Sequence, residues 1–183
     1  NCRIRRINRP YEFNFNQEKV SMSYVRSTIA AMEGYTPGEQ LNHTVIKLNT
    51  NENPYPPSPE VKKELINLDL DKLRLYPSPT SGPLREKASE VYRFPIDQII
   101  AGNGSDDLLT MIFRIFLESG DRVTTFYPTY TLYETLAELQ DAELNYVQLT
   151  DDFQVPADFS DDTSKFVILA NPNSPTGTMI EPE

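Results

Sequence analysis

Three polar stretches hold most of the chemically useful residues in the second half of the chain, and each follows an apolar run. They are Gly102-Asn103-Gly104-Ser105-Asp106-Asp107, Tyr127-Pro128-Thr129-Tyr130 and Asn171-Pro172-Asn173-Ser174-Pro175-Thr176-Gly177. The first stretch precedes an apolar helical stripe over 108–117, which places Ser105, Asp106 and Asp107 at a helix start as cap and first-turn residues. Unpaired backbone N–H groups and the helix dipole make such a start an anion site. We therefore expect a cofactor phosphate to bind there.

Two other interpretations of this glycine-rich stretch remain open. The first is a tight turn that binds nothing. The second is a dinucleotide site, but the third glycine of that motif is replaced by Asp107. Two carboxylates beside a pyrophosphate would also repel it unless their side chains turn away. The Walker A pattern is absent.

From residue 96 onward, strand-like and helix-like segments alternate. We expect strands at 98–101, 122–126, 144–149 and 165–170, and helices at 105–118 and 130–140. This alternation predicts an α/β fold with a mostly parallel sheet between two helical layers. In such sheets ligands bind beyond the carboxyl ends of the strands, where all three polar stretches would lie.

Each of the other two stretches also has a plain structural interpretation. Tyr130 could lay its ring on a flat cofactor or pack on the core as a helix-start aromatic. The 171–177 stretch could hydrogen-bond the edge of a cofactor ring or be an ordinary turn.

The first 80 residues are organised differently. We expect helices at 23–33, 59–67 and 84–94, a short strand at 45–48 and an extended segment at 73–79. We divide the chain into a leader (1–21), an N-terminal arm with an interface segment (22–79) and a large-domain part (80–183). The leader is expected to be disordered or artefactual, the alternative being a basic targeting or nucleic-acid arm.

Composition excludes several classes of function. The net charge is −10, and because residues 1–21 carry five Lys/Arg and two Asp/Glu (+3), the remainder carries −13. Such an acidic body argues against nucleic acid and anionic membranes as partners. The single cysteine, Cys2, excludes a disulfide framework, and no apolar run approaches the ~18 residues of a membrane span. We expect a cytoplasmic protein.

Common catalytic arrangements are also poorly served. His43 is the only histidine, so Ser-His-Asp and histidine–metal schemes have little to work with, and no metal is expected. The acid pairs at 106–107, 151–152 and 161–162 could suggest carboxylate catalysis, but the last two lie in a polar connection typical of solubilising charge.

Five motifs together resemble those of class I/II aminotransferases, and among these the histidinol-phosphate aminotransferases. The motifs are the stretch from Leu48 to Tyr55, the pair Tyr76-Pro77, and the three stretches above, in the same order and spacing. The resemblance covers about Met22 to Glu183.

The resemblance implies pyridoxal 5′-phosphate (PLP) as cofactor, the first half of a fold-type-I large domain, and a homodimer whose sites lie at the subunit interface. It implies that Ser105, Asp106 and Asp107 hold the PLP phosphate and that Tyr130 stacks on its ring. Tyr76 would reach the phosphate of the partner subunit's cofactor. Tyr35 and Asn51 would close over substrate.

Two departures from the family pattern matter. The family usually has Asn before Pro-Thr-Gly, bonded to the phenolic oxygen of the cofactor; here this residue is Ser174, and the contact could pass to Asn173. The family's Schiff-base lysine belongs to its second half, and Lys165 does not match it. We therefore assign no catalytic residue within these 183 residues, treat the chain as an N-terminal fragment and expect it to be inactive by itself.

The reaction implied is transfer of the amino group of L-histidinol phosphate to 2-oxoglutarate. Two alternatives stay open. One is a fold-type-I aminotransferase or decarboxylase for another aromatic or phosphorylated amino substrate. The other is a non-catalytic α/β binding module.

Overall fold

A three-stranded parallel sheet organises the computed structural model, which describes residues 24–32, 46–48 and 51–181. The strands are β1 (Arg122–Tyr127), β2 (Glu143–Gln148) and β3 (Phe166–Val167), in the order β2-β1-β3. The predicted parallel α/β fold is thereby confirmed, although β3 is shorter than the expected strand at 165–170.

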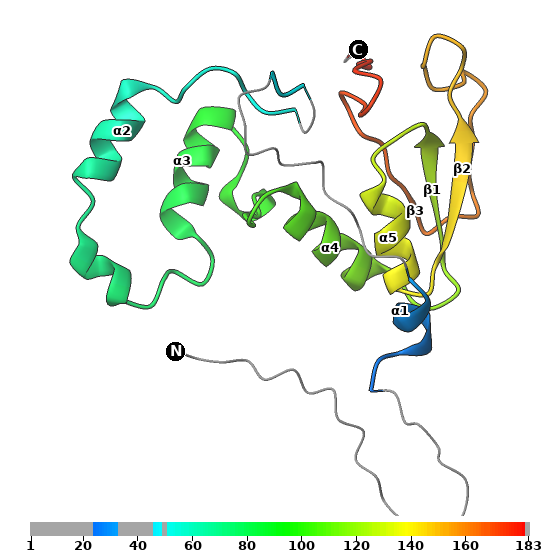
Figure 1. Ribbon diagram of the computed structural model, residues 1–183, viewed down its shortest axis with the longest axis horizontal. Coiled ribbons are helices and arrows are strands. Elements are labelled where there is room, and N and C mark those ends of the chain that lie inside the picture. The colour runs from blue at the N-terminus through cyan, green and yellow to red at the C-terminus, as the bar shows by residue number, and fades with distance from the viewer. Residues whose placement is uncertain (1–23, 33–45, 49–50, 182–183) are drawn as a thin grey trace, which may run out of the picture.

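The central strand, β1, is buried on both faces (Figure 1). Four consecutive residues from Val123 to Phe126 are buried, as is typical of a central parallel strand. Thr124 is fully buried and accepts a hydrogen bond from the Asn145 side chain (2.9 Å). The ring of Phe126 meets that of Phe159 edge-on, with ring centroids 4.9 Å apart.

Two helices enclose the main core against the sheet: α4 (Ser105–Phe116) and α5 (Leu132–Leu139). Apolar residues on one side of each helix produce this packing. The buried cluster consists of Phe113, Leu117, Val123, Tyr133, Leu136 and Ala137. It fixes the start of α4 relative to the start of α5, which matters for the site below.

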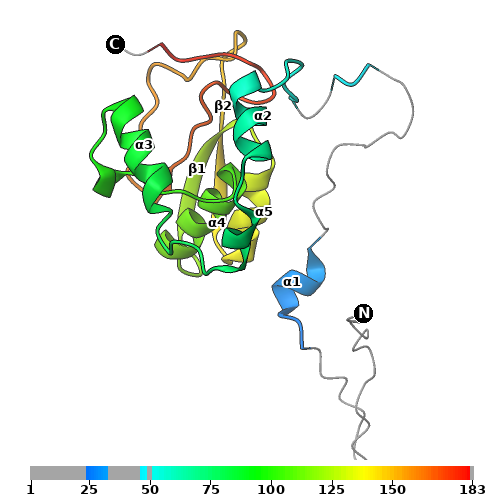
Figure 2. The same cartoon turned by 90° about the vertical axis from the view of Figure 1, so that its left-hand side faces the viewer.

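A helical arm precedes this core and lies on the side of α4 away from the sheet (Figures 1 and 2). It consists of α2 (Pro59–Ile66), the 3-10 turn η1 (Leu70–Arg74), α3 (Gly82–Tyr92) and the 3-10 turn η2 (Ile96–Gln98). None of these four elements contains a buried residue.

The remaining helix, α1 (Ser27–Ala31), is tied to the far end of α5. The Arg26 guanidinium pairs with the Asp141 carboxylate and donates to the Leu139 carbonyl (3.0 Å). This helix is shorter than the one expected over 23–33. Residues 1–23, with the expected leader, and residue 45, which begins the strand expected at 45–48, lie outside the described residues. Residues 46–48 form no strand.

Two expectations near the arm were wrong. The expected strand at 98–101 does not form; instead the Arg85 side chain donates to the carbonyls of Ile96 (2.5 Å) and Ile99 (2.6 Å). The segment expected to be extended over 73–79 begins inside η1. The predicted helices at 59–67 and 84–94 are confirmed, with the second ending at Tyr92 rather than at the proline.

The division into an arm and a large-domain part stays a prediction. Over the described residues, no helix has the length and apolar character needed to cross a membrane.

Asp121 connects the turn after α4 with the residue that precedes β3. Its carboxylate accepts a hydrogen bond from the Glu118 backbone N–H (2.9 Å) and lies 3.5 Å from the Lys165 ammonium. The Glu118 hydrogen bond, followed by the charge of Lys165, holds the pKa of Asp121 below its usual range.

We predict that D121N removes an acid-sensitive part of the stability. A carboxylate with a lowered folded-state pKa stabilises the fold above its unfolded pKa of about 4, and this contribution is lost as pH falls through the folded value. Urea unfolding midpoints at neutral pH and near pH 3 should therefore converge between the wild type and D121N at the lower pH. K165M should reduce this pH-dependent difference without abolishing it. Equal pH dependence in the wild type and D121N would contradict the assignment.

Candidate functional site

The start of α4 forms the centre of the candidate site. Gly104 is the N-cap, with a positive φ of 83° that favours glycine, and no side chain caps the helix. The expectation that Ser105 and the two aspartates supply the cap was therefore wrong, because the helix begins at Ser105 itself. The backbone N–H groups of Ser105, Asp106 and Asp107 belong to the first turn, where an α-helix offers no internal acceptor.

Asp107 closes the turn before the helix. Its carboxylate accepts a hydrogen bond from the Asn103 backbone N–H (3.0 Å). A Cβ on Gly102 would lie 2.9 Å from the Leu108 Cδ2 and 3.0 Å from the Asp107 Oδ2. Gly102 is thus needed for the close approach of this turn to the helix, rather than for a dinucleotide.

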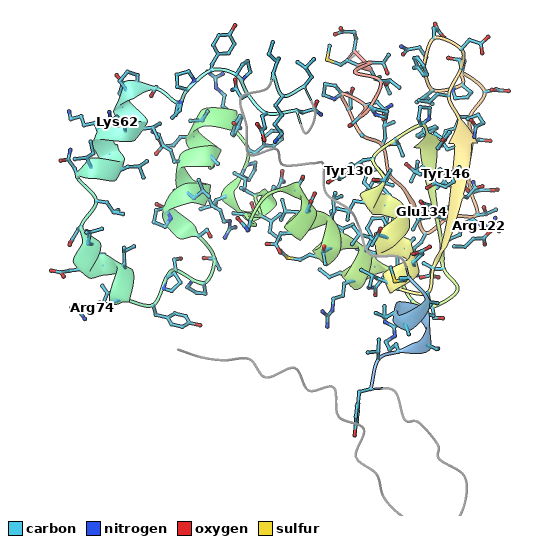
Figure 3. All side chains as sticks on the ribbon, viewed as in Figure 1. Lys62, Arg74, Arg122, Tyr130, Glu134 and Tyr146 are labelled. Atoms are coloured by element: carbon cyan, nitrogen blue, oxygen red, sulfur yellow. The ribbon has the colours of Figure 1, made fainter. Side chains whose placement is uncertain are left out.

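Asp106 is bound by Tyr130, which precedes α5 (Figure 3). The Tyr130 hydroxyl donates to the two carboxylate oxygens at 3.1 and 3.3 Å. Its ring also meets Tyr133 edge-on at a centroid distance of 5.8 Å, and burial raises the pKa of Tyr133. The structure thus brings together two predicted site residues from separate stretches, Asp106 and Tyr130.

The directions of the two carboxylates bear on anion binding. Two negative charges at a helix start would repel a phosphate if they faced it. Here Asp107 binds the preceding turn and Asp106 binds Tyr130, so each accepts hydrogen bonds from the chain itself. The helix N–H groups remain the donors that a ligand would meet first.

The stretch at 171–177 is attached to the stretch at 127–130 through Asn173. Asn173 is 9% exposed, and its side-chain amide donates to the Pro128 carbonyl (2.9 Å) and to the Thr176 hydroxyl (2.8 Å). The Thr129 hydroxyl donates to its side-chain oxygen (3.2 Å). Ser174, the next residue, is partly buried.

Thr129 and Thr176 were not among the predicted site residues. Each directly follows a proline in a polar stretch at a strand end, and this position was the signal that could have identified them. Their hydroxyls fix Asn173, so they shape the site indirectly.

The other predicted site residues are not joined to this cluster. Tyr76 lies between η1 and α3 and is 95% exposed. Asn51 is exposed with a positive φ of 51°. Tyr35 lies outside the described residues. The cations Lys62 and Arg74 point from the arm, away from Tyr130 (Figure 3). No group of three or more His, Cys, Asp or Glu side chains that could hold a metal occurs in the described part of the chain.

Comparison with known proteins identifies relatives for this arrangement. The family model for "Aminotransferase class I and II" matches residues 43–183. A histidinol-phosphate aminotransferase from Brachyspira hyodysenteriae is 40% identical over 161 residues, which are 86% of this chain and 45% of that protein. One from Geobacter sulfurreducens is 45% identical over 157 residues, 83% of this chain and 45% of its own length. The chain therefore spans a little less than half the length of these curated relatives.

Solved structures agree on the fold. A Sinorhizobium meliloti histidinol-phosphate aminotransferase, in complex with pyridoxal-5′-phosphate, aligns with a TM-score of 0.68 at 21% identity, covering 85% of this chain and 44% of that chain. An aminotransferase from Staphylococcus aureus aligns with a TM-score of 0.73 at 17% identity, covering 86% and 46%. The parallel sheet, the start of α4 and the strand-end stretches thus occur in the setting that the five motifs predicted. The chain belongs to the class I and II aminotransferase family.

Proposed function

We propose that the whole protein is a PLP-dependent transaminase that acts on L-histidinol phosphate with 2-oxoglutarate. The observation that carries this proposal is the start of α4, with its glycine cap and its two carboxylates turned to other partners. Membership in the family supports the reaction class. The identity of 40–45% with histidinol-phosphate aminotransferases favours this substrate over other amino donors.

The donors at the start of α4 suit the phosphate of PLP. Three first-turn N–H groups and the Ser105 hydroxyl supply several hydrogen bonds to one phosphate, and the helix dipole adds a favourable field. Gly104 has no heavy atom within 4 Å of where a Cβ would stand, which leaves the approach to these groups open.

The remaining residues would orient the cofactor rather than react with it. Tyr130, fixed through its hydroxyl to Asp106, would lie against the ring, and the Ser174 hydroxyl would donate to the ring's phenolic oxygen. When bound, PLP supplies the electron sink for chemistry at the α-carbon of an amino substrate. Asn51 and Tyr35 would cover the substrate.

We further propose a homodimer in which Tyr76 serves the partner's site. Most large apolar side chains of the arm and of the outer side of α4 are more than half exposed. Examples are Leu65, Ile66, Leu70, Leu73, Tyr92, Phe94, Ile115 and Phe116. Exposed apolar area on this scale is typical of a surface that another part of the protein or a second subunit covers. A cytoplasmic location completes the proposal, supported by a single cysteine in 183 residues.

The activity is tested by an assay of the 183-residue chain and of the longest polypeptide that its gene encodes, each supplied with PLP. We expect the longer polypeptide to convert L-histidinol phosphate and 2-oxoglutarate, with kcat/KM well above that for phenylalanine. The 183-residue chain alone should show no turnover. Preference for phenylalanine, or turnover by neither polypeptide, would contradict the proposal.

The phosphate cradle is tested with S105P and its matched control S105A. Proline at the first helical position removes one N–H with little disturbance of the helix, whereas alanine removes only the hydroxyl. Because a hydrogen bond to a charged group contributes about 1.5–3 kcal/mol, S105P should weaken PLP binding by roughly ten- to hundredfold. It should leave the binding of pyridoxal, which has no phosphate, unchanged. Absorbance titrations of both ligands measure this, and equal PLP affinities for S105P and S105A would exclude the backbone cradle.

The shared site is tested by mixing two defective variants of the longer polypeptide, Y76A and S105P. If sites lie between subunits, a hybrid dimer has one intact site and one doubly defective site. Re-equilibrated equimolar mixtures should therefore regain about a quarter of wild-type activity. Sedimentation equilibrium should give twice the chain mass. A monomer, or no regain of activity in the mixture, would contradict the dimer.

A further inference from the structure

We propose that Asn173 is a positioning residue that fixes the two strand-end loops relative to each other, and not a ligand of the cofactor. The proposal rests on the proposed function for the identity of the ligand only. The hydrogen bonds that carry it exist within the chain itself.

Every polar hydrogen of the Asn173 side chain already has an acceptor. An asparagine amide has two N–H donors, and here one reaches the Pro128 carbonyl while the other reaches the Thr176 hydroxyl. The side-chain oxygen accepts from the Thr129 hydroxyl. With 9% of the residue exposed, these bonds are shielded from water, and losing them would leave buried polar groups unpaired. Asn173 therefore has no N–H left for a ligand.

The backbone of Asn173 closes the turn that contains Ser174. The Asn173 N–H donates to the Thr178 carbonyl (2.8 Å), and its own carbonyl accepts from the Gly177 N–H (2.8 Å). Gly177 has a positive φ of 73°, which favours glycine in this turn. Ser174 is thus held one residue away from a side chain that grips the neighbouring loop.

On the other side, the contacts continue to the start of α4. Pro128 and Thr129, which Asn173 binds, lead directly into Tyr130, and Tyr130 donates to Asp106 in the first turn of α4. The placement of Ser174 relative to Tyr130 and the α4 start consequently depends on one buried amide. A ligand that spans all three elements would bind only when this link holds.

The first test is hydrogen exchange without any ligand, on N173A, T129V and the control S174A. N173A should speed amide exchange in both segments, 127–135 and 171–180, by about tenfold, since removing a buried hydrogen-bonding group commonly lowers local stability by 1–2 kcal/mol. T129V, which removes a single bond, should give a smaller change in the same two segments. S174A should change neither segment. If N173A leaves exchange at 127–135 unaltered, the proposal is wrong.

The second test compares two probes, PLP and inorganic phosphate. Inorganic phosphate needs only the start of α4, so N173A should leave its affinity unchanged, while PLP affinity should fall by about tenfold. An equal fall for both probes would mean general loss of structure and would overturn the positioning role. T129V, with an intact Asn173, should lower PLP affinity in the same direction, which a purely direct ligand role for Asn173 does not predict.

These outcomes separate the inference from the proposed function. Faster exchange in both segments of N173A, together with wild-type protein that binds no PLP, would support the link and overturn the cofactor assignment. Lower PLP affinity in N173A with unchanged exchange would overturn the link and make Asn173 a direct ligand.

Discussion

The parallel pairing of β1 with both neighbours is the constraint on which the rest of the structure depends. Its register matches Arg122 with Glu143 on one side and Val123 with Phe166 on the other, so the strands point the same way. Their carboxyl ends therefore open onto one edge of the sheet. The loops after β1 and β3 meet there, and α5 starts beside α4 because both helices pack on the same core cluster. The site is a consequence of strand direction and helix packing.

Burial along β1 explains why this edge can be precise. Thr124 and Thr125 are fully buried, and each has a hydrogen-bond partner: Thr124 pairs with Asn145, and Thr125 donates to the Ile168 carbonyl (2.9 Å). The second bond continues the link between β1 and the chain after β3, beyond the two residues of regular pairing. Close packing and satisfied polar groups leave few alternative arrangements for the loops that follow.

Residue patterns predicted the elements that depend on local chemistry or on an apolar stripe. The helix at α4, the strand at β1 and the loop positions follow from periodicity and from glycine and proline placement. The strand expected at 98–101 failed because a strand needs a neighbour, and the carbonyls of Ile96 and Ile99 bind Arg85 instead. Nothing in the local sequence of that segment shows what lies beside it. The role expected for Ser105 as a cap failed for a smaller reason, since Gly104 occupies that position with a backbone that other residues rarely adopt.

Side-chain directions at the site lie beyond sequence patterns altogether. Asp106 and Asp107 are adjacent and alike in sequence, yet one binds a tyrosine from the next helix and the other binds the preceding turn. Whether such a pair repels an anion or helps to hold the groups around it depends on these partners, which only the folded chain supplies. The same reasoning applies to Asn173 and Ser174. Neighbours in a motif can divide its work, one fixing the loop and the other facing the ligand, because a buried amide whose donors are all used cannot serve both purposes.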